Sequence, residues 1–275
     1  MVEIRLWGAV SVVVNGREER PTAGRTADLL ACLAWQPGEL VCDEVLTERI
    51  WGESVPADPR DALYSCAKRL RRALAANGAE AAALVRGRTG YLLQVEPDRV
   101  DIHRFRRLVR DADRSGEPSE KALLYGRALR AARGRPLAGF DSSWAARVRH
   151  ALMREQLAAQ LAAASSWARL GCHREVIAEL TELTVEHPLN EAVAGLLMNT
   201  LEQAGQPAEA LLEYVRIRKG LSEELGAMPG SELVGRFEQL LRAENAAVPA
   251  STETAGAPVR ARHGATARRS DAVRL

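Results

Sequence analysis

The stretch RDALYSCAKRLRRALAA, residues 60–76, combines an apolar side and a cationic side on one predicted helix. Its apolar residues recur at i, i+4, i+7 and i+11, a spacing that places on one helical stripe Leu63, Ala67, Leu70 and Leu74. At about 100° per residue, a polar and largely cationic set lies roughly opposite this stripe: Ser65, Lys68, Arg69 and Arg72. Arg60 and Arg71 flank that set. We therefore expect a helix that is buried on one side and presents cations on the other.

The segment that follows this helix predicts a basic hairpin. Residues 84–95, LVRGRTGYLLQV, are typical of two short strands around a Gly-Arg-Thr-Gly turn. The glycines permit the tight turn, and Arg86 and Arg88 lie at or beside its tip.

The residues before the cationic helix predict strands and two more helices. Residues 2–14 alternate in polarity and are followed by Asn15-Gly16, a strong hairpin signal, so we expect two or three antiparallel strands through about residue 21. A helix is expected over 24–35 with Thr22 as a possible N-cap. Leu40-Val41 is expected to be an extended link, and Asp43 to cap a helix over 44–51. Strands, three helices and a hairpin, in this order, match the plan of a winged helix-turn-helix.

The charge distribution supports a polyanionic partner for this region. Residues 1–59 carry five arginines against ten acidic residues, whereas residues 60–88 carry seven basic residues against two acidic ones. The major groove of DNA accepts one helix, and arginine or lysine can bond bidentately to a guanine edge. A basic wing can reach neighbouring phosphates or the minor groove. The competing interpretation is a small helical domain with a solvated basic face.

Beyond residue 97 the chain is expected to be almost wholly helical, in segments near 101–114, 119–133, 142–170, 172–186, 189–204, 207–224 and 230–243. Gly171 and Gly205 are 34 residues apart, and apolar and acidic positions after them match at the same offset. Thirty-four residues is the tetratricopeptide period, in which each helical hairpin stacks on the next. Coincidence between two amphipathic helices is the alternative.

The expected fold class is mainly α with small β: an N-terminal winged helix-turn-helix followed by an all-α tetratricopeptide-like domain. The expected divisions are 1–96 for the winged-helix domain, 97–245 for the helical domain, and 246–275 for a disordered basic tail.

Other functional classes lack a sequence signal. The four cysteines form no Cys-x-x-Cys pair, and the five histidines show no metal-ligand spacing. The catalytic motifs Gly-x-Ser-x-Gly, His-Glu-x-x-His and Gly-x-Gly-x-x-Gly are absent, so we expect no enzyme, no catalytic residue, no cofactor and no metal. No signal peptide or membrane-spanning stretch is visible, and reduced thiols fit a cytoplasmic protein.

The sequence resembles the Streptomyces antibiotic regulatory protein (SARP) family. Members of this family are activators with an OmpR-like winged helix followed by a bacterial transcriptional activation domain. The matching motifs in the first half are Ile50-Trp51-Gly52, Pro56, Ala62-Leu63, Arg69-Leu70-Arg71-Arg72-Ala73-Leu74 and Gly90-Tyr91-Leu92-Leu93. Those in the second half are Glu186-His187-Pro188-Leu189-Asn190-Glu191, Leu197-Met198, Ala204-Gly205, Ala208-Glu209-Ala210-Leu211, Glu223-Glu224-Leu225-Gly226 and Pro229-Gly230. The match spans about residues 2–243.

The sequence also departs from the family pattern. Small or amide residues often precede the Arg-Leu-Arg-Arg run in the family, whereas this chain has Tyr64, Cys66 and Lys68. These positions can change which bases are recognised. The chain has no Gly-x-x-x-x-Gly-Lys motif, so the ATPase domain of longer relatives is not expected, nor is the receiver domain of similar two-component regulators.

The resemblance implies a sequence-specific activator of an antibiotic biosynthetic gene cluster. It implies binding to direct repeats in double-stranded promoter DNA, self-association on DNA, and recruitment of RNA polymerase holoenzyme by protein contact. The candidates for the major groove are Ser65, Lys68, Arg69 and Arg72; Arg60 and Arg71 are phosphate or structural candidates; Arg86 and Arg88 belong to the wing. Two alternatives stay open: a repeat-type adaptor that binds only proteins, and a repressor whose helical domain holds a small effector.

Overall fold

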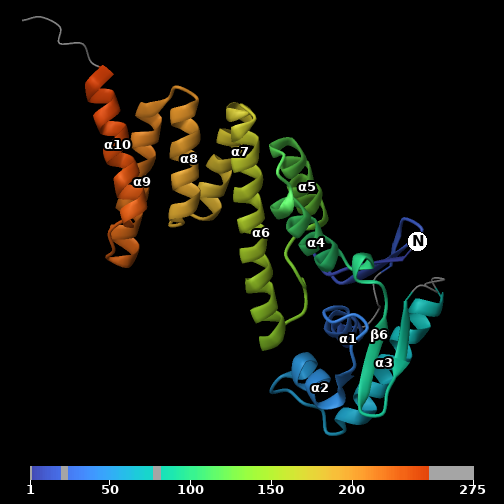
Figure 1. The fold of residues 1–275 in the computed structure, drawn as a ribbon. Coiled ribbons are helices and arrows are strands. Elements are labelled where there is room, and N and C mark those ends of the chain that lie inside the picture. Colours follow the sequence, from blue (N-terminus) through green and yellow to red (C-terminus); the bar gives the residue numbers. More distant parts are fainter. Residues whose placement is uncertain (1, 20–23, 77–81, 248–275) are drawn as a thin grey trace, which may run out of the picture.

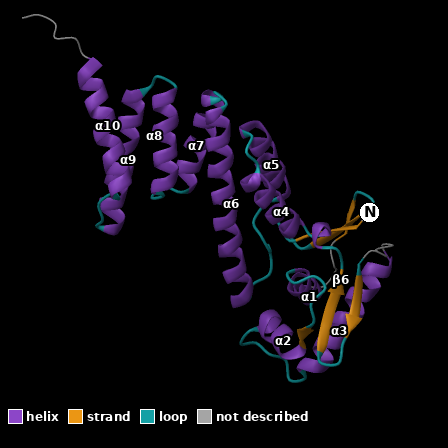
Figure 2. Cartoon of the chain, viewed as in Figure 1, coloured by secondary structure: helices purple, strands orange, loops and turns teal. Residues whose placement is uncertain are grey.

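The computed structural model describes residues 2–19, 24–76 and 82–247 (Figure 1). Strands are confined to the N-terminal part of the described chain, and helices make up the rest (Figure 2). The expected fold class is therefore confirmed. The described residues leave out Thr22, the Asn77-Gly78 pair at which the sequence predicts the cationic helix to end, and the tail from residue 248.

The chain begins with an antiparallel sheet of three strands: β1 (Val2–Arg5), β2 (Ser11–Val14) and β3 (Arg17–Glu19). Val2 pairs with Val14, and the hairpin after β2 turns at Asn15 and Gly16. Both turn residues have positive φ, 49° and 84°, as a two-residue type I′ turn requires. The Asn-Gly signal therefore identified this hairpin correctly.

The winged helix follows, and its elements are α1 (Gly24–Ala34), β4 (Val41–Cys42), α2 (Asp43–Trp51), α3 (Pro59–Ala76), β5 (Ala83–Arg86) and β6 (Gly90–Gln94). The second sheet has the order β4-β6-β5. The expected link at Leu40-Val41 is therefore partly a strand, because Val41 pairs with Tyr91 of the wing.

The prediction that Asp43 caps α2 was wrong. The N-cap position is Cys42, which makes no capping bond with its side chain, and Asp43 is the first helical residue. The Asp43 carboxylate instead binds the guanidinium of Arg86 in the wing.

The second half is a row of helices that begins after a short 3₁₀ turn, η1 (Pro97–Arg99). They are α4 (Asp101–Arg114), α5 (Pro118–Ala131), α6 (Ser143–Arg169), α7 (His173–Glu186), α8 (Glu191–Gln203), α9 (Pro207–Leu225) and α10 (Ser231–Ala247). Each helix packs against the next, and α6 is the long one between the winged helix and the α7–α10 group (Figure 1).

The 34-residue repeat corresponds to one repeated turn. Gly171 follows α6 and Gly205 follows α8, and both have positive φ, 84° and 73°. The amide after each glycine donates to the carbonyl five residues earlier, from Cys172 to Trp167 and from Gln206 to Leu201. The helices after these turns begin 34 residues apart and bury Leu180 and Tyr214 at equivalent positions.

One hydrophobic core connects the N-terminal strands to the first helices of the second half. Trp7 packs edge-on against Phe105 of α4, with ring centroids 5.8 Å apart. The buried Asp101 carboxylate accepts hydrogen bonds from the backbone N–H groups of Leu6, Trp7 and Ile102 at 2.7–2.9 Å. These contacts cross residue 96, and the division of the chain there stays a prediction.

Candidate nucleic-acid interface

Helix α3 is held by its apolar stripe, as its spacing predicts. Leu63, Ala67, Leu70 and Leu74 are all buried, and α3 packs against α1, α2 and β5. The helix lies at the end of the molecule that is remote from α10 (Figure 1). Its outer side is therefore free of the helices of the second half.

The cations of α3 point away from this core. Arg60, Lys68, Arg69 and Arg72 are exposed, and Ser65 is partly exposed. Arg69 turns back far enough for Nη2 to lie 3.6 Å from the Sγ of Cys66. Within the described part of the chain, neither Lys68 nor Arg72 forms an ion pair. Their charge is available to a polyanion.

Arg71 joins α3 to the wing. Its Nε donates to the carbonyl of Leu84 at 3.2 Å, and its guanidinium lies 5.9 Å from the centre of the Tyr91 ring. The side chain is half-buried. This geometry fits the structural role that was one of the two expected for Arg71.

Arg86 is occupied by a partner that the sequence did not indicate. Both Nη atoms bond to the Asp43 carboxylate, at 2.6 and 2.7 Å, and the guanidinium lies 4.5 Å from the centre of the Tyr91 ring. The hydrogen bonds to Asp43 raise the pKa of Arg86 above its ordinary value. Arg86 thus fastens the wing to α2, and contact with DNA would compete with this pair.

The wing tip is fixed by glycines and carries Arg88 outward. A Cβ on Gly90 would lie 2.0 Å from the carbonyl oxygen of Val41, so only glycine permits β4 and β6 to approach this closely. The amide of Asp43 also donates to the carbonyl of Thr89 at 3.0 Å. Arg88 itself is exposed at the turn.

A groove of about 440 Å³ separates α3 from the wing. Tyr64 lines this groove, although it was not among the residues predicted to contact DNA. Its side chain is 55% exposed. The helical phase of residues 60–76 contains this signal, because Tyr64 lies one turn before Lys68 and two turns before Arg72. Tyr91 and Asp43, which also line the groove, were not predictable because their partners are distant in sequence.

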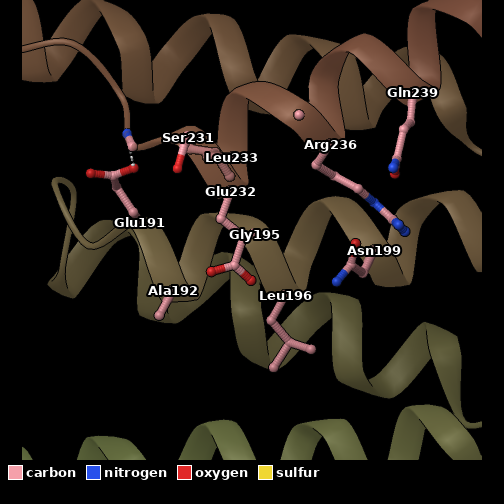
Figure 3. A pocket seen from close by; sticks show the side chains of 12 residues that line it. Glu191, Ala192, Gly195, Leu196, Asn199, Ser231, Glu232, Leu233, Arg236 and Gln239 are labelled. Atoms are coloured by element: carbon pink, nitrogen blue, oxygen red, sulfur yellow. Dashed lines mark hydrogen bonds between the residues drawn. The ribbon is translucent and has the colours of Figure 1, made fainter.

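A second and larger cavity, of about 750 Å³, lies between α8 and α10 (Figure 3), two helices that are far from α3 in the fold (Figure 1). Asn199 and Arg236 face each other at one end, and each has a buried atom without a partner, Asn199 Oδ1 and Arg236 Nε. At the other end Glu191 accepts a hydrogen bond from the backbone of Gly230 at 2.6 Å.

Four aromatic residues of the helical half, Phe140, Trp144, Trp167 and Tyr214, do not line that cavity. Phe140, Trp144 and Tyr214 are buried in the hydrophobic cores, and Trp167 packs partly buried against the core of the last helices. Among the described residues, no group of side chains is suited to hold a metal ion. None of the described helices has both the length and the apolarity to cross a membrane.

Two protein families match the two halves of the chain. The Bacterial transcriptional activator domain family matches residues 100–241, and the family Transcriptional regulatory protein, C terminal, matches residues 18–93. The first match alone covers more than half of the chain.

Individual relatives align along most of the chain. Regulatory protein DnrI of Streptomyces peucetius is 29% identical over 253 residues, which cover 88% of this chain and 93% of DnrI. Transcriptional regulator RedD of Streptomyces coelicolor is 32% identical over 246 residues, 87% of this chain and 70% of RedD. Regulatory protein AfsR of Streptomyces griseus is 29% identical, and the chain spans 24% of its length.

A solved structure has the same fold. Mycobacterium tuberculosis EmbR, in complex with a low affinity phosphopeptide, superposes with a TM-score of 0.83 at 25% identity, over 88% of this chain and 65% of EmbR. The winged helix, the helical activator domain and these relatives agree. The chain therefore belongs to the Streptomyces antibiotic regulatory protein family, and it is a DNA-binding transcriptional regulator and not an enzyme.

Proposed function

We propose that the protein activates transcription of a secondary-metabolite, antibiotic-type biosynthetic gene cluster by binding direct repeats in promoter DNA. The observation that carries this proposal is the row of exposed cations on α3 beside an exposed basic wing tip. A helix of this kind fits the major groove, and a wing of this kind reaches the adjacent backbone.

The residues divide into roles by their surroundings. Lys68, Arg69, Arg72 and Ser65 contact base edges, because they extend from the outer side of α3. Arg60 contacts phosphate, since it is exposed at the start of the helix. Arg71 and Arg86 hold the wing in place, and Arg88 contacts the backbone from the wing tip.

The second half supplies protein contacts. The helical domain, residues 97–245, recruits RNA polymerase holoenzyme in the cytoplasm, and two copies associate head to tail on neighbouring repeats. The winged-helix domain, residues 1–96, positions them on the DNA. The family match over residues 100–241, to an activator domain by name, supports this division.

Footprinting on the promoters next to the protein's own gene, with gel shifts over a salt series, tests the function. Protection of direct repeats with affinity that falls as salt rises is expected. An adaptor that binds only proteins would protect no promoter at any salt concentration. A ligand-sensing repressor would instead hold its effector between α8 and α10 and release DNA when a pathway metabolite binds.

Replacing Arg88 with alanine is expected to weaken binding to operator and unrelated DNA alike, because a wing-tip cation contacts phosphate and no base. The slope of log affinity against log salt should become shallower by about 0.9, the value for one phosphate contact. Affinities measured from about 50 to 200 mM salt check this. Arg218→Ala, which removes an exposed cation of α9, is the control and should leave the slope unchanged. A loss confined to the operator would show that Arg88 recognises bases.

Inserting 5 base pairs between the two repeats is expected to abolish cooperative binding. Repeats one helical turn apart, about 10–10.5 base pairs, place both copies on one face of the duplex, and half a turn moves one copy to the opposite face. Affinities for the native spacing and for insertions of 5 and 10 base pairs measure the effect, with the single repeat as the control. Equal cooperativity at 0 and 5 base pairs would contradict head-to-tail contact.

A further inference from the structure

Tyr64 is an exposed aromatic side chain among the charges of α3. Its side chain is 55% exposed, and it is the large apolar residue that the described part of α3 leaves in water. Arg60, Lys68 and Arg72 lie on the same i±4 row and are also exposed, as is the neighbouring Asp61. A single exposed apolar side chain is normal on most protein surfaces, so only the position of Tyr64 can indicate a function.

That position is in the second turn of α3, one turn N-terminal to Lys68. In helix-turn-helix proteins the N-terminal residues of the recognition helix contact base edges. Within the described residues, the structure shows no hydrogen bond to the Tyr64 hydroxyl and no stacking partner for its ring. The ring lines the groove between α3 and the wing, with Arg60 and Tyr91 also on that groove.

The chemistry of the ring selects what it can recognise. A neutral aromatic ring gives no charge to a phosphate, so it contributes little to the sequence-independent part of binding. The apolar group that the major groove presents is the C5-methyl of thymine, and apolar side chains discriminate by contact with it. Lys68 and Arg72, on the same row, suit the acceptors of guanine.

We infer that Tyr64 is a specificity-determining residue that contacts the C5-methyl group of a thymine in each operator repeat. This inference rests on the proposed placement of the DNA interface on α3. It assigns to this chain a base preference made by an exposed aromatic side chain.

Operator duplexes in which deoxyuridine replaces one thymine at a time test the inference, because this change removes only the methyl group. For the wild-type protein, one position in each repeat should lower affinity about fourfold, the value for one methyl group left in water. The same substitution should leave the affinity of Tyr64→Ala unchanged and should still lower that of Tyr64→Phe. Leu123→Ala, which removes an equally exposed apolar side chain on α5, should behave as wild type.

Three outcomes would overturn the inference. The first is that deoxyuridine lowers the affinity of the wild type and of Tyr64→Ala equally, and the second is that no thymine is sensitive to the replacement. The third is that Tyr64→Phe loses as much operator affinity as Tyr64→Ala, which would indicate that the hydroxyl contacts the DNA backbone. In each of these cases the wild-type protein still binds its operator, so the proposed function stands. A wild-type protein that protects no promoter would instead overturn the proposed function, and this inference with it.

Discussion

Replacing Lys68, Arg69 and Arg72 together with alanine is expected to lower affinity for the operator at least about a hundredfold, since each base-reading contact is worth about 1–3 kcal/mol. The three side chains are exposed and extend from the side of α3 opposite its buried stripe. Alanine is the strongest helix former, so the helix itself should persist. The thermal unfolding midpoint is therefore expected to stay close to that of the wild type.

The matched control removes three cations far from α3. Arg218, Lys219 and Arg242 are exposed on α9 and α10, and their triple alanine variant has the same net charge as the test variant. Affinities for operator and for unrelated DNA, measured at one salt concentration, separate base contacts from general attraction. If the test and control variants bind the operator equally well, the interface is not on the outer side of α3.

The sequence predicted the helices because their signals are local. The i, i+4, i+7, i+11 spacing of Leu63 to Leu74 determined both the buried and the exposed sides of α3, and the structure confirms that phase. The turns at Asn15-Gly16, Gly171 and Gly205 could be predicted for the same reason. Each has positive φ, which favours glycine or asparagine at that position of the sequence.

The wing has features that local sequence signals do not predict. Strand β4 has two residues and exists because Val41 pairs with Tyr91, fifty residues later. Asp43 has the position of a helix cap, yet its carboxylate binds Arg86, and Arg86 therefore is not the free cation that the sequence suggested. Partners of this kind are determined by tertiary packing, and no spacing within one segment reveals them.

The junction between the two halves was also invisible in the sequence. Asp101 is an acidic residue in the first turn of a helix. Acidic residues are common there because their negative charge interacts favourably with the helix dipole. In the structure Asp101 is 2% exposed and binds the backbone of the N-terminal strand region, almost a hundred residues away. This contact ties the N-terminal strand region to the start of α4.

Replacing Asp101 with asparagine is accordingly expected to lower the free energy of unfolding by about 2–4 kcal/mol, because a buried N–H group left without an acceptor costs about 1–3 kcal/mol and two donors then face each other. In the wild type, Oδ1 accepts from Leu6 and Ile102, and Oδ2 accepts from Leu6 and Trp7. The asparagine amide keeps one acceptor oxygen but places an NH₂ group where the second carboxylate oxygen was. Urea unfolding of the two proteins, measured side by side at the same pH, gives the difference in the free energy of unfolding.

The control for this substitution is Asp98→Asn, in η1. Asp98 is a half-exposed carboxylate whose partner is Arg107, at 2.6 Å, and surface pairs of this kind are worth about 0–1 kcal/mol. An Asp101→Asn variant no less stable than Asp98→Asn would mean that other contacts, such as the Trp7–Phe105 packing and the Glu3–Arg104 ion pair, hold the N-terminal sheet on α4. A large loss confined to Asp101→Asn would instead show that the hydrogen bonds to this one buried side chain contribute strongly to holding the N-terminal sheet on α4.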